Sequence, residues 1–271
     1  MSAIDEVFER CAAERCAAFI PFIMAGDPDL GTTPALLQAL AAAGADLIEV
    51  GIPFSDPIAD GPVNQRAASR ALASGTTVGG ILEAVASVRD DLGVPVVLFT
   101  YFNPIRARGL EHFAEQAAAS GVDGVLCVDL PPEEAAEAYL PALQKNYIDP
   151  IFIIAPTSTT ERMKRVAEVS SGFVYYVSRT GVTGERELLT KTLPKEVKRV
   201  RRKVKLPVAV GFGISTPEQV AAVGGIADGV VVGSSLVRVV GEGGPDVAQR
   251  LEALARDLAA PLLAEPRRRW A

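Results

Sequence analysis

The sequence predicts an α/β fold: a (β/α)8 TIM barrel formed by a single domain that spans residues 1–271. Two observations lead to this prediction. Short apolar segments rich in Val, Ile and Phe alternate with Ala- and Leu-rich stretches of helical periodicity, which is typical of a parallel sheet covered by helices. Three stretches, "AAAGADLIEVG", "AASGVDGVLCVD" and "VGGIADGVVVG", also share a Gly and an Asp before an apolar strand. A helix-to-strand unit repeated eight times in about 250 residues fits a closed barrel better than an open doubly wound sheet.

The elements follow one another along the chain without a linker or a shift in composition that would divide it. An extra helix is expected at residues 2–15, ahead of the first strand. Later helices begin with Thr, Ser or Pro and end with Gly in several cases, as capping chemistry predicts. They include residues 32–44, 110–121, 133–144, 160–170 and the basic run 195–205. The eight strands are expected at residues 17–26, 45–51, 95–102, 123–130, 150–156, 172–178, 207–213 and 228–234.

Composition excludes several classes of protein. The apolar runs are well short of the ~20 residues needed to span a bilayer, so no contact with a membrane is expected. The start "MSAIDEVFER" lacks the basic and apolar regions of a signal peptide, which favours a cytoplasmic location. A net charge of −6 argues against nucleic acid as a partner. Cys11, Cys16 and Cys127 are an odd number of cysteines without CxxC spacing, which argues against a disulfide framework and a zinc site.

In a barrel of this type the chemistry lies at the carboxyl ends of the strands. The first strand ends carry mainly acids and aromatics such as Tyr101, together with the amide Asn103, and the last three are rich in glycine: "GVTG", "GFGIS" and "VGSS". Backbone N–H groups and a helix N-terminus at such a position commonly bind phosphate. The sequence therefore predicts a phosphate site after strands six to eight.

The positions of the histidine and the lysines exclude several kinds of catalytic site. The only histidine, His112, falls in a predicted helix away from the strand ends, which argues against a metal site built from histidines and against a Ser-His or Cys-His pair. The lysines fall on predicted helices, in a loop or at the entry to strand seven, so a Schiff base is not expected. Proton chemistry is then left to the carboxylates, with tyrosine as a helper.

Glu49 is the best candidate, because its apolar surroundings disfavour the charged form and raise its pKa towards the range useful near pH 7. The competing interpretation is a structural carboxylate paired with an arginine or a backbone N–H. Asp60 follows on a loop, where we expect it to ionise readily and to stabilise a positive charge or a polarised N–H. Asp56 is compatible with a turn, a solvent-facing acid or a contact with a partner.

The stretches "EVGIPFSDPIADGPVNQ", "VDGVLCVDLPPEEA", "YYVSRTGVTG" and "VAVGFGIS" together resemble the α subunit of tryptophan synthase, over essentially the whole chain. The resemblance implies a lyase that cleaves indole-3-glycerol phosphate to indole and glyceraldehyde 3-phosphate by a retro-aldol reaction. It implies no metal and no cofactor in this chain. The indolenine-like tautomer of the substrate is an electron sink that needs neither lysine nor metal.

By this resemblance Glu49 protonates indole C3 and assists deprotonation of the glycerol hydroxyl. Asp60 interacts with the indole N–H, and Tyr175 lies near the glycerol part of the substrate. Thr183 belongs to a loop that closes over Asp60. The expected phosphate contacts are Gly184, Gly213, Gly233 and Ser234, with Phe212 nearby. The expected lining of the indole pocket is Phe22, Phe99, Leu126 and Ile153, of which Phe99 is bulkier than the aliphatic residue usual in the family.

The resemblance also implies a partner: a separate β subunit that holds pyridoxal phosphate, receives the indole and assembles with this chain as an α2β2 heterotetramer. Pro53, Asp56 and Asn103 are expected at that contact. A stand-alone lyase that releases free indole remains an alternative, and so does a subunit that only activates its partner, although the presence of Glu49 and Asp60 argues against the second. Two other phosphate-binding barrel enzymes are less compatible with the sequence. An indole-glycerol-phosphate synthase would need a lysine at a strand end, and a ribulose-phosphate epimerase would need histidine ligands for a metal; the sequence offers neither at the predicted strand ends.

Overall fold

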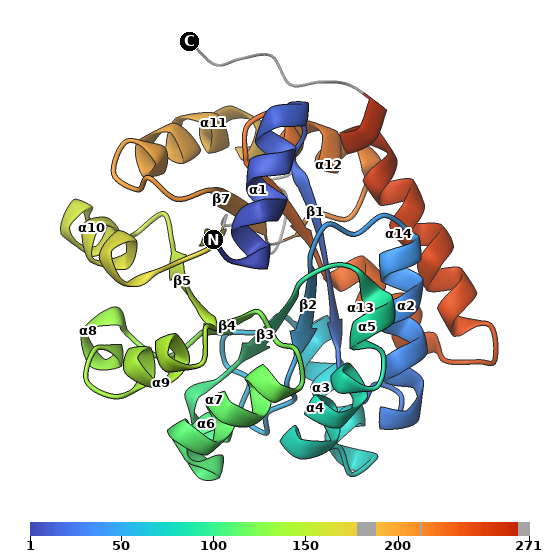
Figure 1. Ribbon diagram of the computed structural model, residues 1–271. Coiled ribbons are helices and arrows are strands. Elements are labelled where there is room, and N and C mark those ends of the chain that lie inside the picture. Colours follow the sequence, from blue (N-terminus) through green and yellow to red (C-terminus); the bar gives the residue numbers. More distant parts are fainter. Residues whose placement is uncertain (178–187, 212, 265–271) are drawn as a thin grey trace.

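The computed structural model describes residues 1–177, 188–211 and 213–264, and its centre is a closed barrel of eight parallel strands (Figure 1). Each strand pairs with the next, and β8 pairs with β1 to close the barrel, for example through Ala18 and Gly229. The predicted barrel is therefore confirmed, with strands shorter than expected. They are β1 (Ala18–Met24), β2 (Ile48–Gly51), β3 (Val96–Thr100), β4 (Gly124–Cys127), β5 (Asp149–Ile154), β6 (Val174–Val177), β7 (Val208–Gly211) and β8 (Gly229–Val232).

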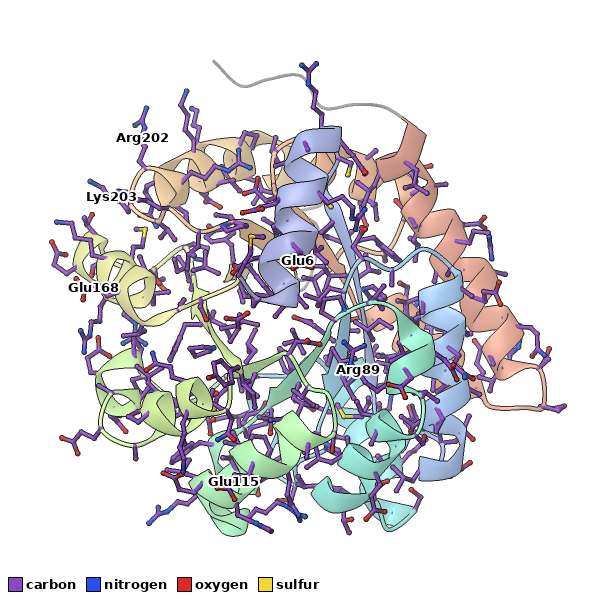
Figure 2. All side chains as sticks on the ribbon, viewed as in Figure 1. Glu6, Arg89, Glu115, Glu168, Arg202 and Lys203 are labelled. Atoms are coloured by element: carbon purple, nitrogen blue, oxygen red, sulfur yellow. The ribbon has the colours of Figure 1, made fainter. Side chains whose placement is uncertain are left out.

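Helices surround the barrel, and charged side chains such as those of Glu115, Glu168, Arg202 and Lys203 lie on its outside (Figure 2). None of the helices within the described ranges is long and apolar enough to cross a membrane. The helices are α1 (Ala3–Glu14), η1 (Leu30–Thr32), α2 (Thr33–Ala42), α3 (Pro62–Ala73), α4 (Val78–Ala86), α5 (Arg89–Leu92), α6 (Phe102–Arg108), α7 (Leu110–Ala119), α8 (Pro132–Ala135), α9 (Tyr139–Lys145), α10 (Thr160–Val169), α11 (Leu188–Arg201), α12 (Pro217–Gly224), α13 (Ser234–Glu242) and α14 (Val247–Ala264).

Two helix predictions need correction. The helix expected at residues 133–144 is two short helices, α8 and α9. Pro141 explains the break, because in one continuous helix its ring would clash with the carbonyl four residues earlier, whereas it fits the first turn of α9. The helix expected at 195–205 begins at Leu188 and ends at Arg201.

Side chains on the strands alternate between the barrel interior and the layer beneath the helices. In β2 and the residue before it, Leu47 belongs to the interior cluster, while Ile48 and Val50 belong to the outer one. Glu49 shares the inward phase with Leu47 and therefore points into the barrel. This alternation is why a strand that reads as uniformly apolar can carry one carboxylate to the interior.

The helix α1 covers the amino-terminal mouth of the barrel, in front of the strands in Figure 1. Its apolar face joins the interior cluster through Ile4, Val7, Phe8 and Cys11. The rings of Phe8 and Phe173 lie 5.4 Å apart. The predicted extra helix is confirmed, and it gives the barrel interior a cover at the end opposite the strand carboxyl ends.

The aspartate that precedes three of the strands in the repeated sequence motif has a structural role. Asp46, Asp123 and Asp228 each accept a hydrogen bond from a backbone N–H on the preceding strand. Each carboxylate also pairs with an arginine; Arg89 of α5, which is labelled in Figure 2, lies 3.3 Å from Asp123. The backbone donors are Phe19, Val96 and Val208, at 2.7, 2.8 and 2.9 Å, and the other arginines are Arg10 and Arg201. The repeated Asp therefore joins neighbouring strands where they begin.

Candidate active site

The inward-facing residues near the carboxyl ends of the strands form one site. The register places Phe22 beside Glu49, Phe99 beside Leu126, and Ile153 beside Tyr175. All six were predicted from the sequence as site residues. Their strands come from both halves of the chain, so closure of the barrel is what brings them to one face.

Glu49 is fully buried, and neither of its carboxylate oxygens has a hydrogen-bond partner among the described residues. Burial alone raises the pKa of this carboxyl to about 8. The expected raised pKa is therefore confirmed, and the competing idea of a structural carboxylate paired with an arginine or a backbone N–H is not supported. A buried polar group without a partner is rare in a folded protein and calls for a functional explanation.

Asp60 lies on the loop between β2 and α3 and is held by Tyr101. The hydroxyl of Tyr101 donates to Oδ2 of Asp60 at 3.0 Å and accepts the N–H of Ala59, also at 3.0 Å. Burial raises the pKa of Asp60, while hydrogen bonds from Tyr101 and Asn64 work against that rise. Asp60 is therefore harder to ionise than an ordinary loop carboxyl because it is partly buried, while Tyr101 and Asn64 favour its charged form.

Tyr175 is 6% exposed and points to the same region. Burial raises its pKa well above the usual value, and the nearby charges of Glu49 and Asp60 raise it further. The three predicted catalytic residues are therefore close enough to interact electrostatically. Gly211 on β7 makes room for this tyrosine, since a Cβ there would lie 2.0 Å from the hydroxyl oxygen.

The apolar wall is built from the predicted indole-pocket residues. The rings of Phe22 and Phe99 meet edge to face, with centroids 5.3 Å apart and planes at 73°. Phe99 and Ile153 are partly exposed and pack on the interior cluster to which Leu126 belongs. Gly51 allows this packing, because a Cβ there would lie 2.8 Å from the Phe22 ring.

The glycine-rich end of the site is described only in part. Gly233 is the N-cap residue of α13 and has no side chain to accept the first helical N–H groups. Ser234 is partly exposed at the first helical position, and the buried hydroxyl of Ser235 has no partner in the described residues. Gly213 has a φ of 79°, which glycine adopts without strain. Thr183, Gly184 and Phe212 lie outside the described residues.

The predicted partner contacts differ in exposure. Asp56 and Asn103 are exposed and line a hollow of about 370 Å³ beside the site. Ile58 lines the same hollow and is 90% exposed, which is unusual for a large apolar side chain. Pro53 is buried in this chain, so its ring does not form part of the exposed surface.

The structure adds site residues to which the sequence assigned no role. Tyr101 follows the third strand, and its position at a strand end was the available signal. Asn64 lies in the first turn of α3, and its side-chain oxygen is buried without a partner among the described residues. Gly211 opens the motif "GFGIS" at a glycine-rich strand end, but its role depends on the ring of Tyr175 from the neighbouring strand, which the sequence could not show.

Comparisons with known proteins agree with this geometry. The model of the family described as "Tryptophan synthase alpha chain" matches residues 8–262. The chain is 51% identical to a tryptophan synthase alpha chain of Geotalea daltonii over 238 residues, 88% of this chain and 90% of that one. It is 48% identical to that of Solibacter usitatus over 260 residues, 95% of this chain and 97% of the relative.

Solved structures show the same similarity in three dimensions. Tryptophan synthase subunit alpha from Legionella pneumophila superimposes with a TM-score of 0.90 at 38% identity, covering 98% of this chain and 100% of the other. A structure of Mycobacterium tuberculosis tryptophan synthase gives a TM-score of 0.88 at 40% identity, covering 96% and 98%.

Proposed function

The chain belongs to the tryptophan synthase alpha chain family, and from this premise we propose how its residues carry out the reaction. The alpha chain is a lyase that cleaves indole-3-glycerol phosphate to indole and glyceraldehyde 3-phosphate. The reaction adds a proton to indole C3, breaks the bond from C3 to the glycerol chain, and removes a proton from the adjacent hydroxyl.

Glu49 is the proposed acid and base for both proton transfers. The observation that supports this most strongly is its buried carboxyl, which has no partner among the described residues and a pKa of about 8. Such a group is protonated at neutral pH and can give its proton to C3. It then recovers a proton from the glycerol hydroxyl, so one carboxyl completes the cycle unchanged.

Asp60 and Tyr175 are proposed to assist from two sides. Asp60, held by Tyr101, accepts the indole N–H and stabilises the tautomer in which the ring nitrogen carries positive charge. The high pKa of Tyr175 keeps its hydroxyl protonated, so it can donate a hydrogen bond to the glycerol part of the substrate.

The rest of the substrate fits the remaining surface. The aromatic pair Phe22 and Phe99, with Leu126 and Ile153, offers the apolar contact that an indole ring requires. The phosphate is proposed to bind at the N-terminus of α13, near Gly213, Gly233 and Ser234, where backbone N–H groups and the helix dipole favour an anion. Gly184, with Phe212 nearby, is proposed to complete the phosphate site, and Thr183 is proposed to belong to the loop that closes over Asp60.

The proposed partner is a tryptophan synthase β subunit that carries the pyridoxal phosphate, in an α2β2 heterotetramer in the cytoplasm. The hollow lined by Asp56, Asn103 and the exposed Ile58 supports a contact here, because it combines apolar and charged surface next to the site. Pro53 would support this surface from beneath, since it is buried.

The direct test is to mix the purified chain with indole-3-glycerol phosphate and to measure indole, with and without a β subunit. We expect indole in both mixtures, and more with the partner. Glu49→Gln should abolish cleavage, because glutamine has no carboxyl proton to transfer. The circular dichroism spectrum and β binding should stay unchanged, because the two side chains have the same shape. Substantial turnover by this variant would contradict the role of Glu49. No indole from the wild-type chain in either mixture would contradict the proposed function.

A further inference from the structure

The last turn of α1 brings two cysteines together. Arg15 adopts the left-handed conformation, with φ 59° and ψ 37°, and reverses the chain after the helix. The N–H of Cys16 then donates to the carbonyl of Cys11 at 2.9 Å, and the N–H of Arg15 donates to that of Ala12 at 3.3 Å. These two bonds define a Schellman motif, in which the side chains at its two ends commonly touch.

The side chains of Cys11 and Cys16 line the same hollow of about 410 Å³ between α1 and the entry to β7. Burial raises the pKa of the Cys11 thiol, and the nearby thiol of Cys16 adds to the rise. Cys11 is 1% exposed and packs on the interior cluster, whereas Cys16 is partly exposed. Both are free thiols. A disulfide requires two cysteines whose backbones lie close together, and the hydrogen bond from the N–H of Cys16 to the carbonyl of Cys11 brings these two backbones together.

We propose that Cys11 and Cys16 are a modification site, at which hydrogen peroxide forms an intrachain disulfide across the end of α1. Cys16 is the first to react because solvent reaches it. Its thiolate attacks a peroxide oxygen, the O–O bond breaks, and a sulfenic acid and one water result. The sulfur of Cys11 then attacks the sulfenic sulfur, the S–S bond forms, and a second water leaves. The two thiols lose two electrons, which reduce the peroxide.

The position of the pair decides what the disulfide does. α1 covers the amino-terminal mouth of the barrel, at the end opposite Glu49. The bond therefore closes the last turn of the covering helix and leaves the proposed catalytic end untouched. Cys127 provides an internal comparison, because it is 3% exposed, packs in the layer beneath the helices and donates to Asp129 at 3.4 Å.

The test treats the native full-length chain with hydrogen peroxide, unfolds it, alkylates the remaining thiols and measures masses. We expect the loss of two hydrogen atoms, alkylation at Cys127 alone, and a bond that joins the tryptic peptides beginning at Cys11 and Cys16. Dithiothreitol should restore both thiols, and Cys127→Ser should leave the reaction unchanged. Cys16→Ser should abolish it and leave Cys11 as a thiol, since Cys11 is buried.

Three results would overturn the proposal. One is two free thiols at Cys11 and Cys16 after peroxide treatment. Another is sulfinic or sulfonic acid at Cys16 in place of the disulfide. The third is a disulfide that forms as fast in denaturing urea as in the native chain, because the fold would then contribute nothing to the pairing.

Discussion

Glu49 links the stability of the protein to pH. Its pKa is about 8 in the folded chain, against 4.5 for a carboxyl in water. Between these two values the folded state binds more protons than the unfolded state, so stability falls as the pH rises through this window. A buried acid proposed for catalysis thus works against the fold at the pH where the protein would act.

Glu49→Gln should remove this dependence. We expect the variant to be more stable than the wild type near pH 8, by roughly a few kcal/mol, and the difference to shrink towards pH 4.5. Urea unfolding at several pH values measures it. Glu83→Gln, at an exposed position on α4, serves as the matched control and should show no such trend. If the free energies of unfolding of the wild type and of Glu49→Gln changed equally with pH across this range, the raised pKa of Glu49 would be contradicted.

Tyr101 positions Asp60 through its hydroxyl, which contacts Asp60 and Ala59. Tyr101→Phe should lower kcat/KM for indole formation roughly ten- to a hundredfold, because a hydrogen bond to a charged group contributes about 1.5–3 kcal/mol. Steady-state kinetics with indole-3-glycerol phosphate measure the loss. Tyr147→Phe, at a site 93% exposed, should have no effect. Unchanged kinetics for Tyr101→Phe would show that the loop holds Asp60 without this bond.

At the scale of the elements, the aspartates at the strand entries hold neighbouring strands together. Asp123 accepts the N–H of Val96 and pairs with Arg89. Asp123→Ala should lower the free energy of unfolding by about 1–3 kcal/mol, because it leaves a strand N–H without its acceptor. Urea unfolding measures this loss. Asp90→Ala, at an exposed site on α5, is the control and should change stability little. If Asp123→Ala and Asp90→Ala lowered the free energy of unfolding equally, the aspartate at the strand entry would have no special structural role.

At the scale of the whole molecule, the two ends of the barrel have different tasks. The amino-terminal mouth is closed by α1, and the carboxyl-terminal end carries the acids, the aromatic pair and the exposed hollow. A substitution under α1 can therefore lower the free energy of unfolding without changing the geometry of the proposed catalytic end. The same separation places the proposed disulfide away from the proposed chemistry.

Ile4 and Ile58 provide a matched pair for this separation. Ile4 is fully buried under the barrel, and Ile58 is 90% exposed at the hollow. Ile4→Ala should lower the free energy of unfolding by about 2–5 kcal/mol without loss of β binding. Ile58→Ala should leave stability nearly unchanged and weaken binding of the β subunit. Thermal unfolding and calorimetric titration measure the two effects. Destabilisation by Ile58→Ala with normal binding would contradict the assignment of the hollow.

Local patterns in the sequence determined the barrel, the covering helix and the burial of Glu49. Strand and helix periodicity act over a few residues, and the phase that Glu49 shares with Leu47 places its carboxyl in the apolar interior, where burial raises its pKa. The corrections to these predictions were local too: Pro141 split one predicted helix, and partial burial raised the pKa of Asp60.

Only the tertiary structure decided the contacts between distant parts of the chain. Tyr101 reaches Asp60 across 41 residues, and Asp123 reaches Val96 across 27. Gly211 matters because barrel closure sets the ring of Tyr175 against it. Sequence periodicity fixes which face a residue presents, whereas its neighbours across the barrel depend on register and closure, which no short segment encodes.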